Sequence, residues 1–185
     1  LLNVQNSKLD SDSDVYKFPF DVLNTQDWDI EHIDSFHTNA LKKDELKKEW
    51  IETAMMDRQG FLSEQEKCDI SQMMETKNYD NIIGLLKKNA GEIEADEEMK
   101  NSIGNLTLLD AATNRSYGNS LFCTKRRIII DKIRQGVFVP IATQYIFSKF
   151  YDDRRTNLSA WTKDDMDAYQ KYIAETLIEY LPENN

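Results

Sequence analysis

Two short stretches of the sequence carry side chains that could hydrolyse a phosphodiester bond. In the first, Asp29 and Glu31 alternate along the chain and His32 follows directly. The second lies far along the chain and places Asn105 and Asn114 nine residues apart. A histidine that accepts a proton, together with carboxylate and amide oxygens, is the set of groups that a nuclease site with one divalent metal ion requires.

Hydrolysis at neutral pH needs a general base, a divalent cation and oxygen ligands for that cation. His32 suits the first role because a neutral imidazole can accept a proton from water. Mg²⁺ prefers oxygen ligands, so Asp29, Glu31 and the side-chain oxygen of Asn105 or Asn114 suit the others. Successive side chains of a strand point to opposite faces, so a bend or the end of the strand must bring Glu31 and His32 together.

These stretches resemble an HNH (ββα-metal) nuclease, in which two strands and a helix hold one metal ion. The likeness rests on Asp-x-Glu-His-Ile at residues 29–33 and on Gly-Asn-Leu-x-Leu-Leu at residues 104–109, with a second Asn nine residues after the first. The sequence is most similar to the C-terminal nuclease domain of GmrSD-type, modification-dependent restriction enzymes. Residues 138–151 and the region of Trp161 are similar to the C-terminal trailer of that family.

The resemblance implies a role for each residue. His32 would be the general base, and Asn105 would hydrogen-bond to the imidazole and orient it. Glu31 and Asn114 would bind the divalent metal ion, Mg²⁺ or alternatively Mn²⁺. Asp29 could replace Glu31, because the acidic ligand of the family is often the shorter Asp. The resemblance also implies a DNA substrate, restriction of foreign or modified phage DNA, and a nucleotide-hydrolysing N-terminal regulatory domain in the full-length protein.

The net charge of −10 is the main objection to a DNA substrate, because binding to the phosphate backbone draws on Lys and Arg. Basic residues nevertheless gather close after Asn114, and we expect them to bind DNA: Arg115, Lys125, Arg126 and Arg127. Steps of about 100° per residue fan the last three around a helix, so at most two can face one DNA strand. An earlier predicted helix supplies the next candidates: Lys42, Lys43, Lys47 and Lys48.

The apolar periodicity predicts an α+β fold that is mostly α-helical. Two strands, near residues 27–33 and 103–109, are expected to pair antiparallel, with the helix after Thr113 packed across them as a ββα-metal core. A helical insertion at about residues 40–100 separates the strands, and a helical C-terminal trailer follows. Capping boxes predict two helix starts, Ser63 with Glu66 and Thr162 with Asp165.

At 185 residues the chain is long enough for one domain with a full core. Residues 1–16 are polar and predict a linker or flexible arm, and residues 17–182 predict the nuclease domain. No apolar run approaches the roughly 20 residues that span a bilayer. Cys68 and Cys123 lack metal-ligand spacing. We therefore expect a cytoplasmic domain without membrane contact, and the missing initiator Met suggests a C-terminal fragment of a longer protein.

Two other functions fit the same sequence. The first is a DNA- or protein-binding module that keeps the fold without catalysis. It is suggested by the acidic composition and by Ser35, which stands where the family usually has a proline. The second is an acidic helical adaptor for a basic partner, which would leave Glu31, His32 and Asn114 apart in space.

Overall fold

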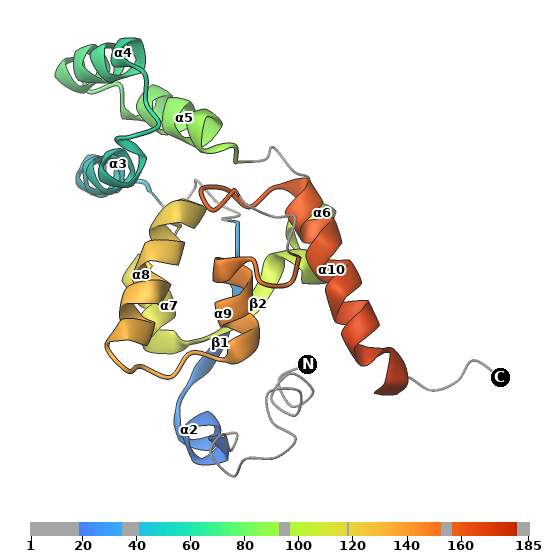
Figure 1. Ribbon diagram of the computed structural model, residues 1–185. Coiled ribbons are helices and arrows are strands. Elements are labelled where there is room, and N and C mark those ends of the chain that lie inside the picture. Colours follow the sequence, from blue (N-terminus) through green and yellow to red (C-terminus); the bar gives the residue numbers. More distant parts are fainter. Residues whose placement is uncertain (1–18, 35–40, 93–96, 118, 153–156, 181–185) are drawn as a thin grey trace.

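The computed structural model describes residues 19–34, 41–92, 97–117, 119–152 and 157–180 (Figure 1). The predicted arm at residues 1–16 lies outside these ranges. The fold is mostly helical around one two-stranded sheet. In chain order the elements are α2 (Phe20–Thr25), β1 (Trp28–His32), α3 (Asp44–Arg58), α4 (Glu64–Glu75), α5 (Tyr79–Ala90), α6 (Glu97–Lys100), the 3-10 segment η2 (Ile103–Asn105), β2 (Leu106–Asp110), α7 (Ala111–Tyr117), α8 (Phe122–Arg134), α9 (Ile141–Ser148), α10 (Lys163–Leu177) and the 3-10 segment η3 (Ile178–Tyr180). Within the described ranges, no helix has the length and apolar character needed to cross a membrane.

Strands β1 and β2 pair antiparallel although a long helical insertion separates them in the sequence. The register places Trp28 opposite Asp110 and His32 opposite Leu106. Helix α7 follows β2 directly and packs against both strands. Asp110 fixes this turn, because its Oδ1 accepts a hydrogen bond from the Thr113 amide at 2.9 Å. The predicted strand pairing and the helix across the strands are confirmed.

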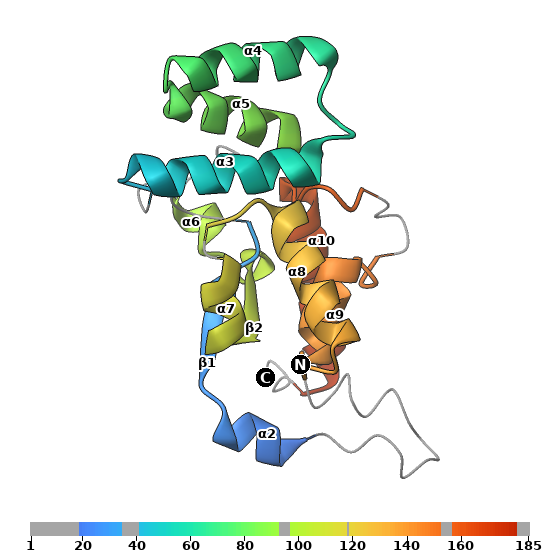
Figure 2. The same cartoon turned by 90° about the vertical axis from the view of Figure 1, so that its left-hand side faces the viewer.

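The insertion forms a layer of its own from α3, α4 and α5 (Figure 2). Helix α4 begins with the predicted capping box, in which the Glu66 amide donates to Ser63 Oγ and the Ser63 amide donates to Glu66 Oε2. Helix α5 ends at Gly91, whose φ of 74° favours glycine. Buried apolar side chains from the three helices share one core, which includes Trp50, Ile51, Ile70, Ile82 and Leu86.

A second core joins the sheet to the C-terminal helices. Its buried members include Ile33, Leu109, Phe122, Phe147, Trp161 and Tyr169. Lys149 lies beside this core, and its buried ammonium donates to Asp165 Oδ2 and to the Ala160 carbonyl oxygen, each at 2.8 Å. Asp165 also completes the predicted capping box with Thr162 at the start of α10. One carboxylate therefore fixes both a helix start and a buried cation.

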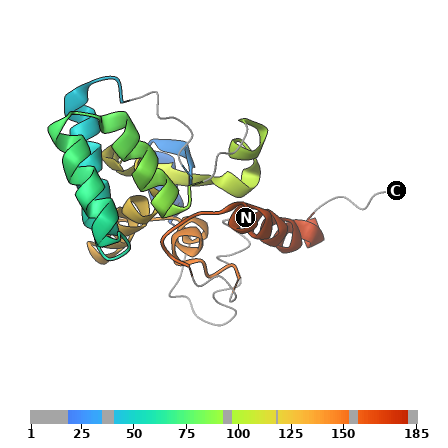
Figure 3. The same ribbon diagram turned by 90° about the horizontal axis from the view of Figure 1, so that it is seen from above.

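Helix α10 packs closely on η2, the segment that precedes β2. A Cβ atom at Gly104 would overlap the backbone carbonyl of Met166 in α10. Trp161 Nε1 also donates to the Gly104 carbonyl oxygen at 3.3 Å. Seen from above, α10 points away from the insertion (Figure 3). The C-terminal trailer thus positions the segment that carries Asn105.

We predict that Gly104→Ala lowers the free energy of unfolding by about 2 kcal/mol, because the added methyl group must displace helix backbone. Gly84→Ala is the matched control. Gly84 lies inside α5 with open space around its missing Cβ, so alanine should raise stability there by about 0.5 to 1 kcal/mol. Urea unfolding of both variants measures the two changes, and equal effects would contradict the close packing at Gly104.

Candidate active site

Asp29 on β1 and Asn114 on α7 meet in the structure. The Asn114 amide group donates to Asp29 Oδ2 at 3.1 Å, across a sequence separation of 85 residues. Both side chains are partly buried at this contact. Glu31 lies two residues beyond Asp29 on the same strand, so the two carboxylates share a face. The structure therefore brings Asp29 and Asn114, two of the three predicted metal ligands, into contact.

Glu31 is bound by a lysine that was expected to contact DNA. Lys125 Nζ donates to Glu31 Oε1 at 2.7 Å and to the His32 carbonyl oxygen at 2.6 Å. The Lys125 side chain is 1% exposed. Burial lowers its pKa, while the charge of Glu31 and the hydrogen bond to it act in the opposite direction. The expectation of a phosphate contact from Lys125 is therefore wrong in this arrangement, because its helix turns it inward onto β1.

His32 is half-buried at the end of β1, and Asn101 is one partner of its imidazole. Its Nε2 lies 3.0 Å from Asn101 Oδ1. Since an amide oxygen only accepts hydrogen bonds, this contact places a proton on Nε2 and makes Nδ1 the acceptor nitrogen of a neutral ring. No motif spacing singled out Asn101, which lies between α6 and η2.

Asn105 does not orient the imidazole, contrary to the prediction. It is fully buried, and its Oδ1 accepts a hydrogen bond from the Asp34 amide at 2.8 Å. Its Nδ2 donates to the carbonyl oxygens of Asp34 and Lys100 at 3.2 and 2.9 Å. Because η2 directs this side chain to the backbone beyond β1, Asn105 holds the segment that follows the histidine. Asn101 takes the contact that was expected for Asn105.

A pair of buried acidic side chains lies just beyond β1. Asp34 is 1% exposed, and within the described ranges neither of its carboxylate oxygens has a hydrogen-bond partner. Burial, and then the charge of Glu92, raise the pKa of Asp34 to about 7, against the opposing charges of Lys100, Lys125 and Lys87. Burial likewise raises the pKa of Glu92, although Lys87 Nζ lies 3.3 Å from its Oε2. The end of β1, the end of α5, α6 and α8 thus share one group of interacting charges.

The three arginines expected to bind DNA have different surroundings. Arg115 is exposed on α7 and lines a hollow of about 280 Å³ with Asp110. Arg127 Nε donates to Asp57 Oδ1 at 2.6 Å, and this hydrogen bond raises the pKa of Arg127. Arg126 lines a separate hollow, and its buried Nε has no hydrogen-bond partner among the residues that the structure describes. Arg115 and Arg126 remain available for an anion, whereas Arg127 is already paired.

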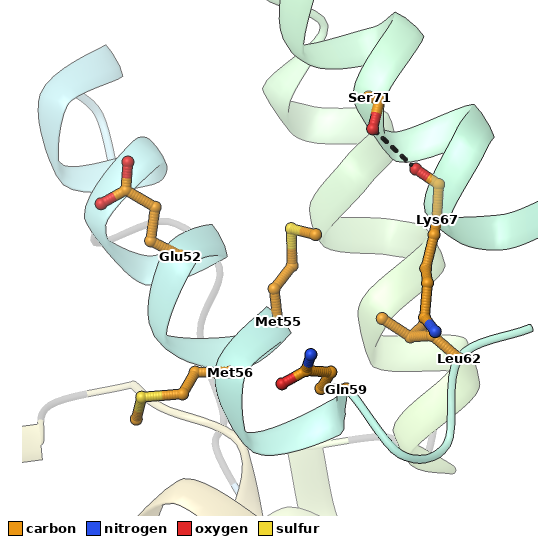
Figure 4. Close-up of a pocket in the computed structure, with 7 residues that line it drawn as sticks. All are labelled: Glu52, Met55, Met56, Gln59, Leu62, Lys67 and Ser71. Carbon is orange, nitrogen blue, oxygen red and sulfur yellow. Dashed lines mark hydrogen bonds between the residues drawn. The ribbon is translucent and has the colours of Figure 1, made fainter. Parts of the chain in front are cut away.

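Binding of a metal ion at this site would require the side-chain amide of Asn114 as a ligand. No group of three His, Cys, Asp or Glu side chains within the described ranges could hold an ion. A hollow of about 430 Å³ in the insertion, between α3 and α4, contains Met55 and Met56, with Glu52 as its one carboxylate (Figure 4). That hollow lacks the groups for hydrolysis, so the contact between Asp29 and Asn114 remains the candidate centre.

The raised pKa of Asp34 leads to a prediction of how the free energy of unfolding changes with pH. A folded-state pKa of about 7 lies above the unfolded value of 3.8, so the folded protein retains a proton that the unfolded chain loses. This carboxyl therefore favours folding at low pH, and the contribution is lost as pH rises toward 7. We expect Asp34→Asn to raise the free energy of unfolding relative to the parent by about 2 kcal/mol more at pH 8.0 than at pH 5.5.

Urea unfolding at the two pH values measures this difference. Asp131→Asn on α8 is the control, because the Asp131 side chain is 46% exposed, and its effect should be similar at both pH values. A pH-independent effect of Asp34→Asn would contradict the assigned protonation.

The comparisons with known proteins give one match. Residues 5–176 match the family of GmrSD restriction endonucleases, C-terminal domain. No curated protein and no solved structure matches the chain. The matched range contains β1, the insertion, β2, α7 and nearly all of the trailer. The chain therefore belongs to the family of C-terminal domains of GmrSD restriction endonucleases, which gives it a nuclease role in restriction.

Proposed function

We propose that this domain is an HNH-type endonuclease that hydrolyses DNA phosphodiester bonds with the help of a divalent metal ion. The observation that carries the proposal is the contact between Asp29 and Asn114 at 3.1 Å, on the strand that ends at His32. An acidic oxygen ligand, an amide and a histidine thus come from two elements that pack together. The adaptor alternative predicted that Glu31, His32 and Asn114 would lie apart. The contact brings Asn114 to Asp29, which shares a strand with Glu31 and His32, and so supports the nuclease instead.

The side chains present suit Mg²⁺ or Mn²⁺. Carboxylate and amide oxygens are ligands for hard cations, which retain several waters and need few protein groups. A half-turn of the Asn114 amide would place its oxygen, instead of its nitrogen, beside Asp29. Asp29 and Asn114 would therefore hold the ion, with Glu31 next to them on the strand but neutralised by Lys125. When bound, the ion would neutralise charge that develops on the phosphate.

His32 would take the proton from the attacking water. Its Nε2 hydrogen bond to Asn101 fixes the orientation of the ring and leaves Nδ1 as the basic atom. Lys125 holds the backbone carbonyl of His32 from the other side. Asn101 is thus a positioning residue, and Asn105 supports the fold of the segment beyond the histidine.

The DNA strand would be bound by Arg115 and Arg126, which, unlike Arg127, form no ion pair within the described ranges. Arg115 lies on the same helix as Asn114, and Arg126 follows Lys125 on α8. Lys47 on α3 pairs with Asp80 at 2.7 Å, so the lysines of that helix are weaker candidates. We further propose that the domain acts in the cytoplasm on foreign or modified DNA, under the control of a nucleotide-hydrolysing N-terminal domain in the full-length protein.

One observation favours a second function, a DNA-binding module without catalysis. The ammonium of Lys125 pairs with the carboxylate of Glu31, the residue that the resemblance assigns as a metal ligand. If metal binding requires Glu31 and not Asp29, this ion pair would keep the site inactive. The two functions differ in whether added metal supports cleavage.

The proposed function predicts that the domain nicks supercoiled plasmid DNA in Mg²⁺ or Mn²⁺ and that EDTA stops the reaction. His32→Ala should lower the cleavage rate by at least about 100-fold, because the loss of a general base typically costs that much. DNA binding, measured by fluorescence anisotropy, should change little. Cleavage by the His32→Ala variant at the parent rate would rule out this base, and a parent protein that binds DNA but never cuts it would favour the binding module.

The two asparagines should respond differently to substitution by alanine. Asn101→Ala should lower the cleavage rate by about tenfold, because the imidazole loses an orienting partner. Its melting temperature and the Mg²⁺ concentration for half-maximal rate should stay close to those of the parent. Asn105→Ala should instead lower the free energy of unfolding by about 3 kcal/mol, because buried backbone groups lose their partners. Melting curves and metal titrations separate the two effects, and a stable, inactive Asn105→Ala protein would restore the direct role first expected for Asn105.

A further inference from the structure

A hollow of about 500 Å³ lies beside α8, the helix whose Lys125 contacts β1. It is formed by the end of α3, by α8 and by residues 157–159. Arg126 lines the hollow and directly follows Lys125, whose ammonium contacts Glu31. Adjacent helix residues differ in direction by about 100°, so α8 presents one basic side chain to β1 and the next to the hollow.

The hollow contains one positive charge that nothing in the described ranges neutralises. Arg127 also lines it, but Asp57 accepts hydrogen bonds from Arg127 Nε and Nη2 at 2.6 and 3.1 Å. Asp57 also accepts a hydrogen bond from Thr124, so its carboxylate is held by residues of α8. The buried Nε of Arg126, in contrast, has no hydrogen-bond partner in the described part of the chain, and burial lowers the pKa of this guanidinium. An anion would supply the missing hydrogen bonds and compensate the charge.

An aromatic ring stands at the same hollow. Phe61 is 61% exposed, although its backbone is held by hydrogen bonds to Arg58 and Asn89. The Arg58 guanidinium lies 4.4 Å from the centre of the ring and does not line the hollow. A fixed and exposed ring that is backed by a cation suits stacking on a nucleobase.

We propose that this hollow binds one nucleotide, with its phosphate on Arg126 and its base stacked on Phe61. Asn157 and Ser159 add polar groups to the lining of the hollow. The nucleotide can belong to the DNA strand that runs to the active site, in which case the inference rests on the proposed function, or it can be a free nucleotide of the same chemistry. Both sources require the anion contact and the stacking platform together.

The test measures the binding of a fluorescein-labelled single-stranded oligonucleotide by anisotropy, in Ca²⁺ and over a salt titration. Arg126→Gln and Phe61→Leu should each weaken binding by about tenfold, the order expected for one stacked base or one charged contact. Arg126→Gln should also lower the slope of log affinity against log salt by about 0.7, the value for one phosphate on a single strand. Arg126→Lys should keep the slope, and Phe61→Tyr should keep the affinity.

Two control variants make the same changes elsewhere on the surface. Arg134→Gln removes a charge from the same helix at a side chain that is 76% exposed, and Phe150→Leu removes a ring that is 74% exposed. Both should bind the oligonucleotide as the parent does, and thermal melting should show that all variants are folded. The proposal is overturned if the control pair weakens binding as much as the Arg126 and Phe61 pair, or if neither pair does.

Competition with dAMP separates the two sources. Displacement of the oligonucleotide from the parent, but not from Arg126→Gln, shows that a free nucleotide enters the hollow. Absence of displacement, with the variant effects intact, assigns the hollow to the DNA strand. Plasmid nicking is measured separately. If Arg126→Gln and Phe61→Leu weaken binding but the parent never cleaves DNA, the proposed function alone is refuted. If the parent cleaves DNA and neither substitution weakens binding, this inference alone is refuted.

Discussion

The geometry of the site depends on the hydrogen bonds that the buried ammonium of Lys125 donates to β1. This ammonium donates to the Glu31 carboxylate and to the His32 carbonyl oxygen at the same time, so α8 holds both a side chain and the backbone of β1. A charge taken out of water costs several kcal/mol unless it is paired and hydrogen-bonded. Lys125 therefore restricts where the end of β1 can lie, and it holds the backbone of His32 in place relative to α8.

This pair is part of a larger balance of charges. Glu31, Asp34 and Glu92 are opposed by Lys87, Lys100 and Lys125, and these groups come from the β1 region, α5, α6 and α8. The insertion is thus more than a connection between the two strands, because its last helices supply charges that the site region needs. Asn105 adds fixed hydrogen bonds to the same region by holding the backbone of Asp34 and Lys100.

Much of the fold could be predicted from the sequence because the signals are local. The capping boxes at Ser63 and Thr162 depend on residues three apart, and strand alternation alone places Asp29 and Glu31 on one face. The choice between Asn101 and Asn105 as partner of the histidine could not be predicted, because it depends on how η2 turns against α10. The inward direction of Lys125 was missed for a similar reason: a basic block usually predicts a solvated face, and only packing shows which member is buried.

The internal pairing of cations bears on the proposed binding of DNA by a protein with a net charge of −10. Lys125, Lys149 and Arg127 each bind a carboxylate within the structure, so they offer little to a phosphate. Exposed charges farther than about 8 Å from the DNA are largely screened at physiological ionic strength, and the acidic surface then repels the DNA only weakly. A guanidinium in direct contact with a phosphate is screened much less than those distant charges. Under the proposed function, attraction or repulsion of DNA would therefore be decided at the site, by Arg115, Arg126 and the metal ion, and not by the net charge of the chain.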